Sequence, residues 1–415
     1  MKVIVVGAGL AGLTCAKVLV ERSAEVTIFE ASDGFGGRVR TDEKDGFLLD
    51  RGFQVYFAAY PVARRHLDHE ALSLRSFDPG AIIRHRREES VLSDPLRDPK
   101  AFLPSLLSDA ATFSDKLRTL KFAMGSVLKG AEAASRLDGE GDVSTLSYLR
   151  DRGFSEEFIN NFYGPFYGGI FLDRSLSTSA RVLRFTFKML ATGKTAVPAR
   201  GMGEIPKQLA ARLPLGAVRT SSPVSSLLRE KDRIVGVEAA GEEHEADAVV
   251  VATEAPAAGR LTGQTVPEGT VGQLCVYYIA DDLGSGRKII LNAGDAGFVN
   301  NAVQISNVSP LYAPPGQRLL SVVALNGFEL PDEEIYRRGV EDVTRWYPEA
   351  NLEPLAIYRV PYAQFAQPPG IHQKLPKNRT HTPGLLLAGE YTEDSSINGS
   401  MFSGEKAAEE VMRTR

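Results

Sequence analysis

3-VIVVGAGLAG-12 joins a run of four branched apolar residues to three glycines in the spacing G-x-G-x-x-G. The apolar run predicts a short buried strand over residues 2–6, and the apolar repeat that follows predicts a helix over residues 10–21. Gly7 would permit the tight turn between them, Gly9 would let the backbone approach a pyrophosphate, and Gly12 would let the helix pack close to the strand. The helix N-terminus would then face phosphate charge.

A second strand, 25-EVTIFE-30, follows the predicted helix and ends in an acid, Glu30, 18 positions after Gly12. At this place in a strand–helix–strand unit, a carboxylate accepts a hydrogen bond from a ribose hydroxyl and repels a 2′-phosphate. The unit therefore predicts an α/β fold with a Rossmann-like dinucleotide-binding domain. The alternative is a glycine-rich turn that holds no ligand.

Three further blocks resemble the flavin-containing amine oxidase superfamily, which also holds protoporphyrinogen oxidases and carotenoid desaturases. They are 34-GFGGRVRT-41, the β-rich segment 218–258, and the closing segment 385-LLLAGEYTEDSSINGSMFSGEKAAEEV-411. Gly36, Gly37, Arg38 and Thr41 match the superfamily's GGR-x-x-T motif. The sequences of two further segments resemble most the protoporphyrinogen oxidase and carotenoid (phytoene) desaturase branch. They are 168-GGIFLDRSLSTS-179 and 201-GMGEIPKQLAARL-213. This resemblance implies an FAD-dependent oxidoreductase.

The resemblance also implies which residues meet the cofactor. Arg38 and the neighbouring glycines would approach the pyrophosphate and the flavin, Glu390 the ribityl or pyrophosphate region, and the backbone at Val224 the adenine. The backbone from Asn398 to Met401 would meet the pyrimidine edge, where a helix N-terminus would stabilise negative charge on the reduced flavin. The predicted cofactor-binding residues are Gly7, Gly9, Leu10, Ala11, Gly12, Glu30, Ala31, Gly36, Gly37, Arg38, Gly52, Phe53, Gln54, Val224, Ala252, Gly389, Glu390, Asn398, Gly399, Ser400 and Met401. These motifs contain no cysteine or histidine for a covalent link, so we expect non-covalent FAD.

The spacing of the blocks predicts a discontinuous FAD-binding domain over residues 1–75, 198–262 and 378–415. Residues 76–197 and 263–377 would form a mixed α+β substrate domain with a helical lid. A chain of 415 residues suits such a division. From apolar periodicity we expect helices over residues 102–110, 114–130, 144–152, 155–162 and 332–346, and strands over residues 273–280 and 318–325.

The segment 162-FYGPFYGGIF-171 combines aromatic residues with glycines, which suits a wall against a flat or apolar substrate. The alternative is a hinge with aromatic packing. The segment 358-YRVPYAQFAQPPGI-371 resembles one that passes the flavin in related enzymes, although a proline-rich connector would look alike. From these segments and the strand at 273–280 we expect Tyr167, Phe171, Tyr278 and Tyr362 to line a substrate pocket.

Flavin enzymes oxidise by hydride transfer to flavin N5, and few protein acids or bases are then required. No catalytic side chain can be named, and the six histidines form no metal-ligand pattern, so each is expected on the surface or in a loop. Many amine oxidases carry a lysine where Gln273 and Leu274 stand here, and an aromatic-cage tyrosine where Ser396 stands. The sequence therefore favours dehydrogenation of an apolar or aromatic small molecule, with oxygen or a quinone as the electron acceptor. The alternatives are a flavin amine oxidase and a non-catalytic flavin-binding protein.

Composition excludes some partners and favours a compartment. The net charge of −4 gives no basic excess for nucleic acid, and two separated cysteines suit a reducing, cytoplasmic location. The helix at 114–130 has Lys116, Arg118, Lys121 and Lys129 beside an apolar stripe. We expect the stripe to face the core, which leaves at most peripheral membrane contact.

Overall fold

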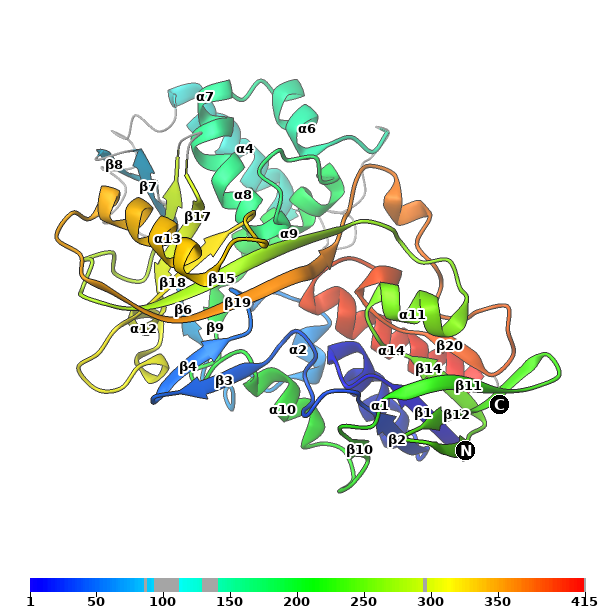
Figure 1. Cartoon of the computed structure of the whole chain (residues 1–415). Helices are drawn as coiled ribbons and strands as arrows, with labels where there is room; N and C mark the ends of the chain where they lie inside the picture. The colour runs from blue at the N-terminus through cyan, green and yellow to red at the C-terminus, as the bar shows by residue number, and fades with distance from the viewer. Residues whose placement is uncertain (86–87, 93–111, 129–140, 294–296, 414–415) are drawn as a thin grey trace.

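The computed structural model describes residues 1–415 except 86–87, 93–111, 129–140, 294–296 and 414–415. Two large sheets organise the described residues, and a group of helices lies above the larger one (Figure 1). Both helices and strands contribute to the core, so the fold is a mixed α/β fold, as the sequence predicts.

A five-stranded parallel sheet forms around the first strand. Its order is β10 (Val218–Arg219), β2 (Glu25–Phe29), β1 (Lys2–Val6), β14 (Ala248–Val251) and β20 (Leu385–Leu387). These strands come from three distant parts of the chain, each inside a segment assigned to the cofactor domain, although the domain boundaries themselves stay a prediction. The strands predicted over residues 2–6 and 25–30 are confirmed.

Alternate residues of β1 face two different cores, because successive side chains of a strand point to opposite faces. Val3 and Val5 belong to the core under α1 (Leu10–Glu21) and α14 (Ile397–Arg413). Ile4 and Val6 belong to a core shared with the three-stranded sheet of β11 (Val224–Glu230), β12 (Arg233–Ala239) and β13 (Glu242–Glu245). Burial on both faces is typical of a parallel sheet.

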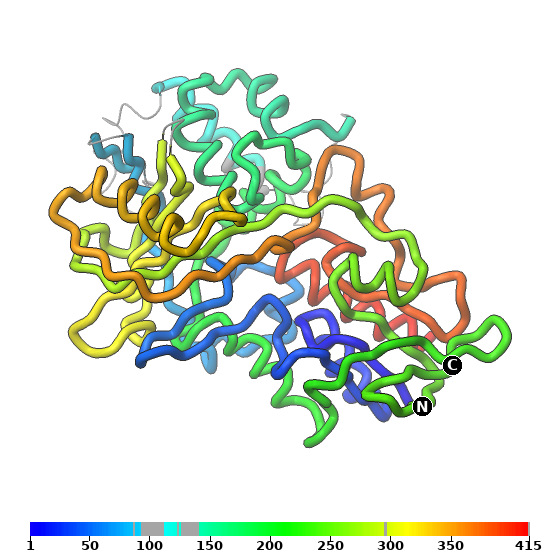
Figure 2. Tube along the Cα trace, in the orientation of Figure 1, coloured from blue at the N-terminus to red at the C-terminus, as the bar shows by residue number. Residues whose placement is uncertain are grey.

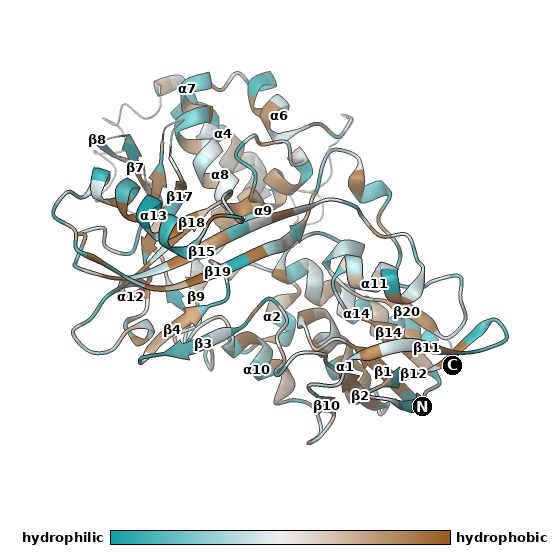
Figure 3. Cartoon of the chain, viewed as in Figure 1, coloured by the Kyte–Doolittle hydropathy of each residue, from teal (hydrophilic) through white to brown (hydrophobic). Residues whose placement is uncertain are grey.

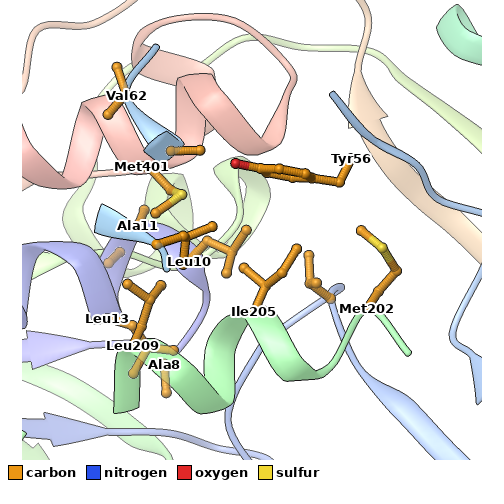
Figure 4. Packing of buried hydrophobic residues seen from close by; sticks show 14 of the residues in the cluster. Ala8, Leu10, Ala11, Leu13, Tyr56, Val62, Met202, Ile205, Leu209 and Met401 are labelled. Carbon is orange, nitrogen blue, oxygen red and sulfur yellow. The ribbon is translucent and has the colours of Figure 1, made fainter. Parts of the chain in front are cut away.

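The first and last helices of the chain pack against each other, as the blue and red segments of Figure 2 show. At Gly404 of α14 the two backbones come close, since a Cβ there would lie 2.2 Å from the carbonyl oxygen of Ala11. Met401 lies beside Leu10 and Ala11 in the same core (Figure 4). This packing holds the closing segment against the glycine turn.

The larger sheet has seven strands. Its order is β19 (Leu352–Phe365), β15 (Thr270–Ala280), β18 (Leu319–Ala324), β17 (Val299–Gln304), β16 (Ile289–Asn292), β7 (Ala81–His85) and β8 (Glu88–Leu92). Its central strands are strongly apolar, which Figure 3 shows as brown along β15 and β18. α13 (Asp332–Trp346) packs against this sheet through Ile335, Val343 and Trp346. The predicted strands at 273–280 and 318–325 and the predicted helix at 332–346 are confirmed.

Six short or medium helical segments form the helical group. They are α4 (Phe113–Leu128), α6 (Thr145–Asp151), α7 (Glu156–Phe158), a π-helical turn (Ile159–Tyr163), α8 (Gly164–Phe171) and α9 (Ala180–Thr192). Ser144 and Ser155 cap α6 and α7 by accepting from the backbone N–H groups of Ser147 and Phe158. The helix predicted at 144–152 is confirmed, and the one predicted at 155–162 is divided between α7 and the π-helical turn. The helix predicted at 102–110 lies outside the described residues.

α4 turns a different face inward from the one that the sequence predicts. Its anchors are Phe122, whose ring lies 4.3 Å from that of Phe187, and the buried Asp115, whose carboxylate accepts from the backbone and hydroxyl of Ser155. Leu117 of the apolar stripe is 58% exposed, and Leu120 and Met124 are exposed too. The expectation that the stripe faces the core is therefore wrong, because Phe122 and Asp115 fix the rotation of the helix.

Short elements connect these layers. They are β3 (Thr41–Lys44), β4 (Phe47–Asp50), β5 (Tyr56–Phe57), α2 (Ala63–His66), β6 (Arg75–Ser76), β9 (Thr195–Val197), α10 (Glu204–Ala210), α11 (Ala255–Thr262), α12 (Ile305–Val308) and 3-10 turns at Pro310–Tyr312, Ile371–Gln373 and Glu390–Thr392. Within the described ranges, no helix has the length and apolar character needed to cross a membrane.

Candidate functional site

One cavity of about 2720 Å³ runs from the glycine turn after β1 to the helical group. Its wall takes residues from the turn, the closing segment, β15, β19, α8 and α9. A pocket for a single small ligand encloses about 300–1,000 Å³. The cavity is therefore large enough for a dinucleotide and a second molecule together.

The glycine turn opens one end of this cavity. Gly7 has φ +103°, a conformation that favours glycine, and a Cβ at Gly12 would lie 2.0 Å from the Gly7 carbonyl oxygen. Gly9, by contrast, lines the cavity, and nothing lies within 4 Å of a Cβ built on it. Gly9 is also the N-cap of α1 and offers no side-chain cap, so the first N–H groups of the helix point to a space that an anion can fill.

Glu30 follows β2 at the same edge of the sheet. One oxygen of its carboxylate accepts from Ala8 N at 2.7 Å, and the other accepts from Ser32 N at 2.9 Å and Ser32 Oγ at 2.8 Å. These bonds tie the carboxylate to the glycine turn and aim it along the cavity wall. The oxygen that accepts from Ala8 N keeps one further lone pair with which it can accept a hydrogen bond from a ligand hydroxyl.

Arg38 connects two distant segments beside the turn. Its Nη1 donates to Glu390 Oε1 at 2.7 Å and to the Ala363 carbonyl oxygen at 2.6 Å, and its guanidinium lies 5.2 Å from the centre of the Tyr362 ring. Burial opposes the charge of Arg38, but the Glu390 carboxylate outweighs it and raises the pKa of the guanidinium. Gln54 donates to the Arg38 carbonyl oxygen at 2.7 Å, while its buried Oε1 has no partner among the described residues.

The closing segment forms the next part of the wall. Asn398, in the first turn of α14, accepts from Val62 N at 2.9 Å, and both Asn398 and Ser400 line the cavity. Gly389 has φ +154°, which lets the chain turn sharply between β20 and Glu390. The hydrogen bond from Val62 thus holds the N-terminal turn of α14 at the cavity.

The structure brings most of the predicted cofactor residues to one cavity and leaves some behind it. Those on the cavity wall are Gly7, Gly9, Leu10, Ala11, Glu30, Gly36, Gly37, Arg38, Phe53, Gln54, Ala252, Gly389, Glu390, Asn398 and Ser400. Those away from it are Gly12, Ala31, Gly52, Val224, Gly399 and Met401. Gly12 and Met401 instead pack the helices behind the wall, and Val224 packs into the core shared by β1 and the β11–β13 sheet.

Aromatic side chains form the other end of the cavity. Phe158, Phe162 and Phe166 stack in series with ring centres 5.3 Å apart at each step, and Tyr167 and Phe171 line the cavity with them. The glycines of this segment lie in α8, where Gly168 packs against Arg174 and Gly169 against Asn301. The function of Gly168 and Gly169 in the fold is therefore close packing within a helix.

Two tyrosines expected in the pocket lie elsewhere. Tyr278 is fully buried, and its hydroxyl donates to the Tyr336 carbonyl oxygen at 3.0 Å in the core under α13. On β15 its neighbour Tyr277 takes the opposite face, as strand alternation requires. Tyr362 packs beside Arg38 behind the wall, and its neighbours Ala363 and Gln364 line the cavity instead.

Two polar side chains that were not among the predicted cofactor or pocket residues also face the cavity. His372, expected in a surface loop, is half-buried on the wall, and its buried Nδ1 has no partner among the described residues. Burial, with a contribution from the Arg181 charge, lowers the pKa of His372 to about 4, so the ring is neutral at pH 7. Gln273 lines the cavity as well, and its Nε2 donates to the Phe53 carbonyl oxygen at 3.2 Å. The only local signal for His372 was its place after the 368-PPG-370 turn.

Asp394 and Ser396 stand between the two ends of the cavity. The Ser396 hydroxyl donates to the Asp394 carboxylate, and burial raises the pKa of Asp394 to about 6. Ser396 lines the cavity and, unlike a tyrosine, presents no ring to it. No group of His, Cys, Asp and Glu in the described ranges could hold a metal ion.

Comparison with known proteins shows which family this chain resembles. The family model described as flavin containing amine oxidoreductase matches residues 10–412. The chain is 23% identical to a 15-cis-phytoene desaturase of Synechococcus elongatus, over 99% of this chain and 96% of that protein. It is 29% identical to a coproporphyrinogen III oxidase of Propionibacterium freudenreichii over 40% of this chain and 31% of that protein.

The fold is shared with a solved structure of a putative protoporphyrinogen oxidase from Exiguobacterium sp. 255-15. The TM-score is 0.77 at 18% identity, and the match covers 100% of this chain and 99% of that chain. The family match spans nearly the whole sequence, and the structural match spans all of it. The chain therefore belongs to the flavin-containing amine oxidoreductase family and is an FAD-dependent oxidoreductase.

Proposed function

We propose that this enzyme dehydrogenates an apolar or aromatic small molecule and delivers the hydride to flavin N5. The observation that carries this proposal is the continuity of one cavity between the glycine turn at Gly9 and the aromatic wall of α8. Oxygen or a quinone would then reoxidise the flavin.

The residues at the glycine end fit FAD. The uncapped N-terminus of α1 suits a pyrophosphate, and the open space at Gly9 admits it without a side chain in the way. Glu30 is placed to accept from a ribose hydroxyl, and the buried, unpartnered Gln54 Oε1 can accept from a donor on the cofactor. The Arg38–Glu390 pair supplies a fixed cation beside them. When bound, FAD supplies the two-electron acceptor.

The N-terminal turn of α14 would contribute electrostatically. Its unpaired backbone N–H groups carry partial positive charge, and the cavity-lining Asn398 and Ser400 belong to this turn. Such a turn stabilises negative charge that develops beside it during reduction. The hydrogen bond from Val62 and the packing of α14 on α1 hold this turn in place.

The aromatic end would bind and orient the substrate. Stacked rings of Phe158, Phe162 and Phe166 give a flat apolar surface that excludes water. Neutral His372 can accept a hydrogen bond at Nδ1 from a polar group of the substrate at pH 7, since protonation would require a much lower pH. These features support an apolar substrate with few polar atoms.

Simple amines receive less support from the cavity. Gln273 and Ser396 stand where many amine oxidases carry a lysine and a cage tyrosine, and the Ser396 hydroxyl is engaged by Asp394.

The test begins with the purified protein. Acid precipitation should release intact FAD into solution, as non-covalent binding requires, and flavin left attached to peptide would contradict that part of the proposal. The flavin-bound enzyme is then mixed anaerobically with a polyene, a porphyrinogen and a set of amines while the flavin absorbance is followed. We expect the polyene or the porphyrinogen to bleach the flavin. Bleaching by amines alone would indicate an amine oxidase, and no bleaching by any of them would favour the non-catalytic alternative.

A further inference from the structure

α9 runs along the whole substrate end of the cavity. Its 13 residues give a length of about 20 Å. Val182, Phe185, Thr186 and Leu190 line the cavity at helical spacing, so one face of the helix forms a continuous and mainly apolar wall. Tyr60 stacks on Phe185 near the middle of this wall, with ring centres 6.2 Å apart.

The two ends of α9 lie beside different parts of the site. At its N-terminal end, the N-cap Ser179 donates its backbone N–H to the Gln367 carbonyl oxygen at 2.8 Å, and Gln367 Oε1 accepts from Ser395 N at 3.1 Å. This end therefore lies next to the closing segment and hence to the proposed flavin position. At its C-terminal end the chain continues into Lys194, and β9 pairs there with β6. The Phe77 backbone N–H bonds to the Thr195 carbonyl oxygen at 3.0 Å, so Lys194 lies across from Asp78.

This outer end of the cavity is rich in cations. Arg75, Lys194, Arg287 and Lys288 line it, and the acids there are Asp78 and, on its outer rim, Glu70. Asp78 pairs with Arg287 at 2.6 Å. Arg75 and Lys194 are both exposed to solvent, and no ion pair to either side chain occurs within the described ranges. Both also line the small adjoining pocket on the surface.

We propose that the substrate carries an anionic group, a carboxylate or a phosphate, which Arg75 and Lys194 hold at the outer end while the apolar body lies along α9. This inference rests on the proposed function, because it assigns the apolar wall to the substrate. It adds a substrate class, an anionic amphiphile, and an orientation in which the charged end points away from the flavin.

Each part of such a substrate would meet a matching environment in the cavity. A charged group keeps most of its hydration at the exposed outer end, so binding there avoids the large cost of burying a charge. The apolar body gains from burial against Phe185 and Leu190 over the length of the helix. A protonated amine would be repelled by Arg75 and Lys194 at the outer end, and a neutral hydrocarbon would leave these two side chains without a function in binding.

The experiment measures binding, so it needs no knowledge of the true substrate. Dodecanoate, dodecan-1-ol and dodecylamine share one chain length and differ in head-group charge. Each is titrated into the flavin-bound enzyme, and the dissociation constant is taken from the change in flavin absorbance or by calorimetry. We expect dodecanoate to bind about tenfold more tightly than dodecan-1-ol, which is the combined effect of two partly exposed charge pairs. Added salt should reduce this preference.

The variant Arg75→Gln/Lys194→Gln should lose the preference for dodecanoate and keep the affinity for dodecan-1-ol. Arg229→Gln, on the exposed β11–β12 hairpin, is the matched control and should change neither constant. Equal binding of the acid and the alcohol to the wild type would overturn this inference and leave the apolar pocket of the proposed function intact. A preference for dodecanoate that survives in the double variant would also overturn it, and failure of all three probes to bind would reject the anionic site and the apolar pocket together.

Discussion

Arg38 Nη1 lies 2.7 Å from Glu390 Oε1, although the two residues are 352 positions apart in the sequence. The Glu390 side chain is 6% exposed and the Arg38 side chain 29% exposed, so the pair is largely removed from water. Removal of one partner would leave the other charge buried without compensation, which is strongly destabilising.

Glu390→Gln should therefore lower the free energy of unfolding by about 3 kcal/mol and weaken FAD binding as well. Urea unfolding of the apoprotein and fluorescence titration with FAD measure the two effects. Glu410→Gln breaks an exposed pair with Arg413 on α14 and serves as the control, with an expected loss of no more than about 1 kcal/mol. If both variants lose the same small amount, the Arg38–Glu390 pair does not support the fold.

Gly9→Ala and Gly12→Ala should separate cofactor binding from folding. The Gly9 backbone has φ −73° and its Cβ would meet open cavity, so the apoprotein should keep its stability to within about 0.5 kcal/mol while FAD affinity falls at least about tenfold. At Gly12 the methyl group would meet the Gly7 carbonyl oxygen, so apoprotein stability itself should fall by about 1–3 kcal/mol or more. Thermal unfolding with and without FAD distinguishes the two. Equal FAD affinity of Gly9→Ala and wild type would show that the phosphates do not pass Gly9.

Glu30→Ala should cost about 1.5–3 kcal/mol in FAD affinity, the range for a hydrogen bond to a charged group. The same carboxylate also holds Ala8 N and Ser32, so part of the loss can come from a looser glycine turn. Ser32→Ala removes the 2.8 Å bond from Ser32 Oγ and keeps the carboxylate, so it reports how much of the loss comes from that contact. Circular dichroism checks that both variants fold. An unchanged FAD affinity in Glu30→Ala would remove Glu30 from the site.

Asp50 should make stability depend on pH. Asp50 is 4% exposed, and burial raises the pKa of its carboxyl to about 6. Its carboxylate accepts hydrogen bonds from Thr41, Tyr312 and Met202, which lower the pKa, but the effect of burial is larger. A raised pKa means that the folded state binds the proton more tightly, so this contribution is present below the ordinary pKa of 3.8 and is lost as pH rises through about 6. The loss amounts to about 3 kcal/mol.

The measurement compares unfolding free energies of wild type and Asp50→Asn between about pH 4 and pH 7. The advantage of the wild type over the variant should shrink by about 3 kcal/mol across this range. Asp45→Asn, in the exposed turn between β3 and β4, controls for the change in net charge. An advantage that stays constant or grows with pH would show that Asp50 is already charged at the acid end.

The sequence by itself determined the parts of this protein that depend on local pattern. The run of apolar residues at 3–6, the glycine spacing and the helical repeat at 10–21 predicted β1, the turn and α1, because each rests on backbone preferences within a few residues. The resemblance of the closing segment to known flavoproteins likewise predicted that Glu390 and Asn398 meet the same cofactor as Gly9, and all three residues line one cavity.

Only the tertiary structure decided which faces of these elements meet. Tyr277 and Tyr278 are neighbouring tyrosines of β15, and the pairing of this strand with β18 and β19 fixes their directions. Tyr277 points toward Asp50, and Tyr278 points into the core under α13. Phe122 and Asp115 likewise set the rotation of α4 and left its apolar stripe exposed, and the turn at 371–373 brought His372 to the cavity wall. These outcomes depend on contacts between residues far apart in the chain, and periodicity within one segment carries no information about its partner.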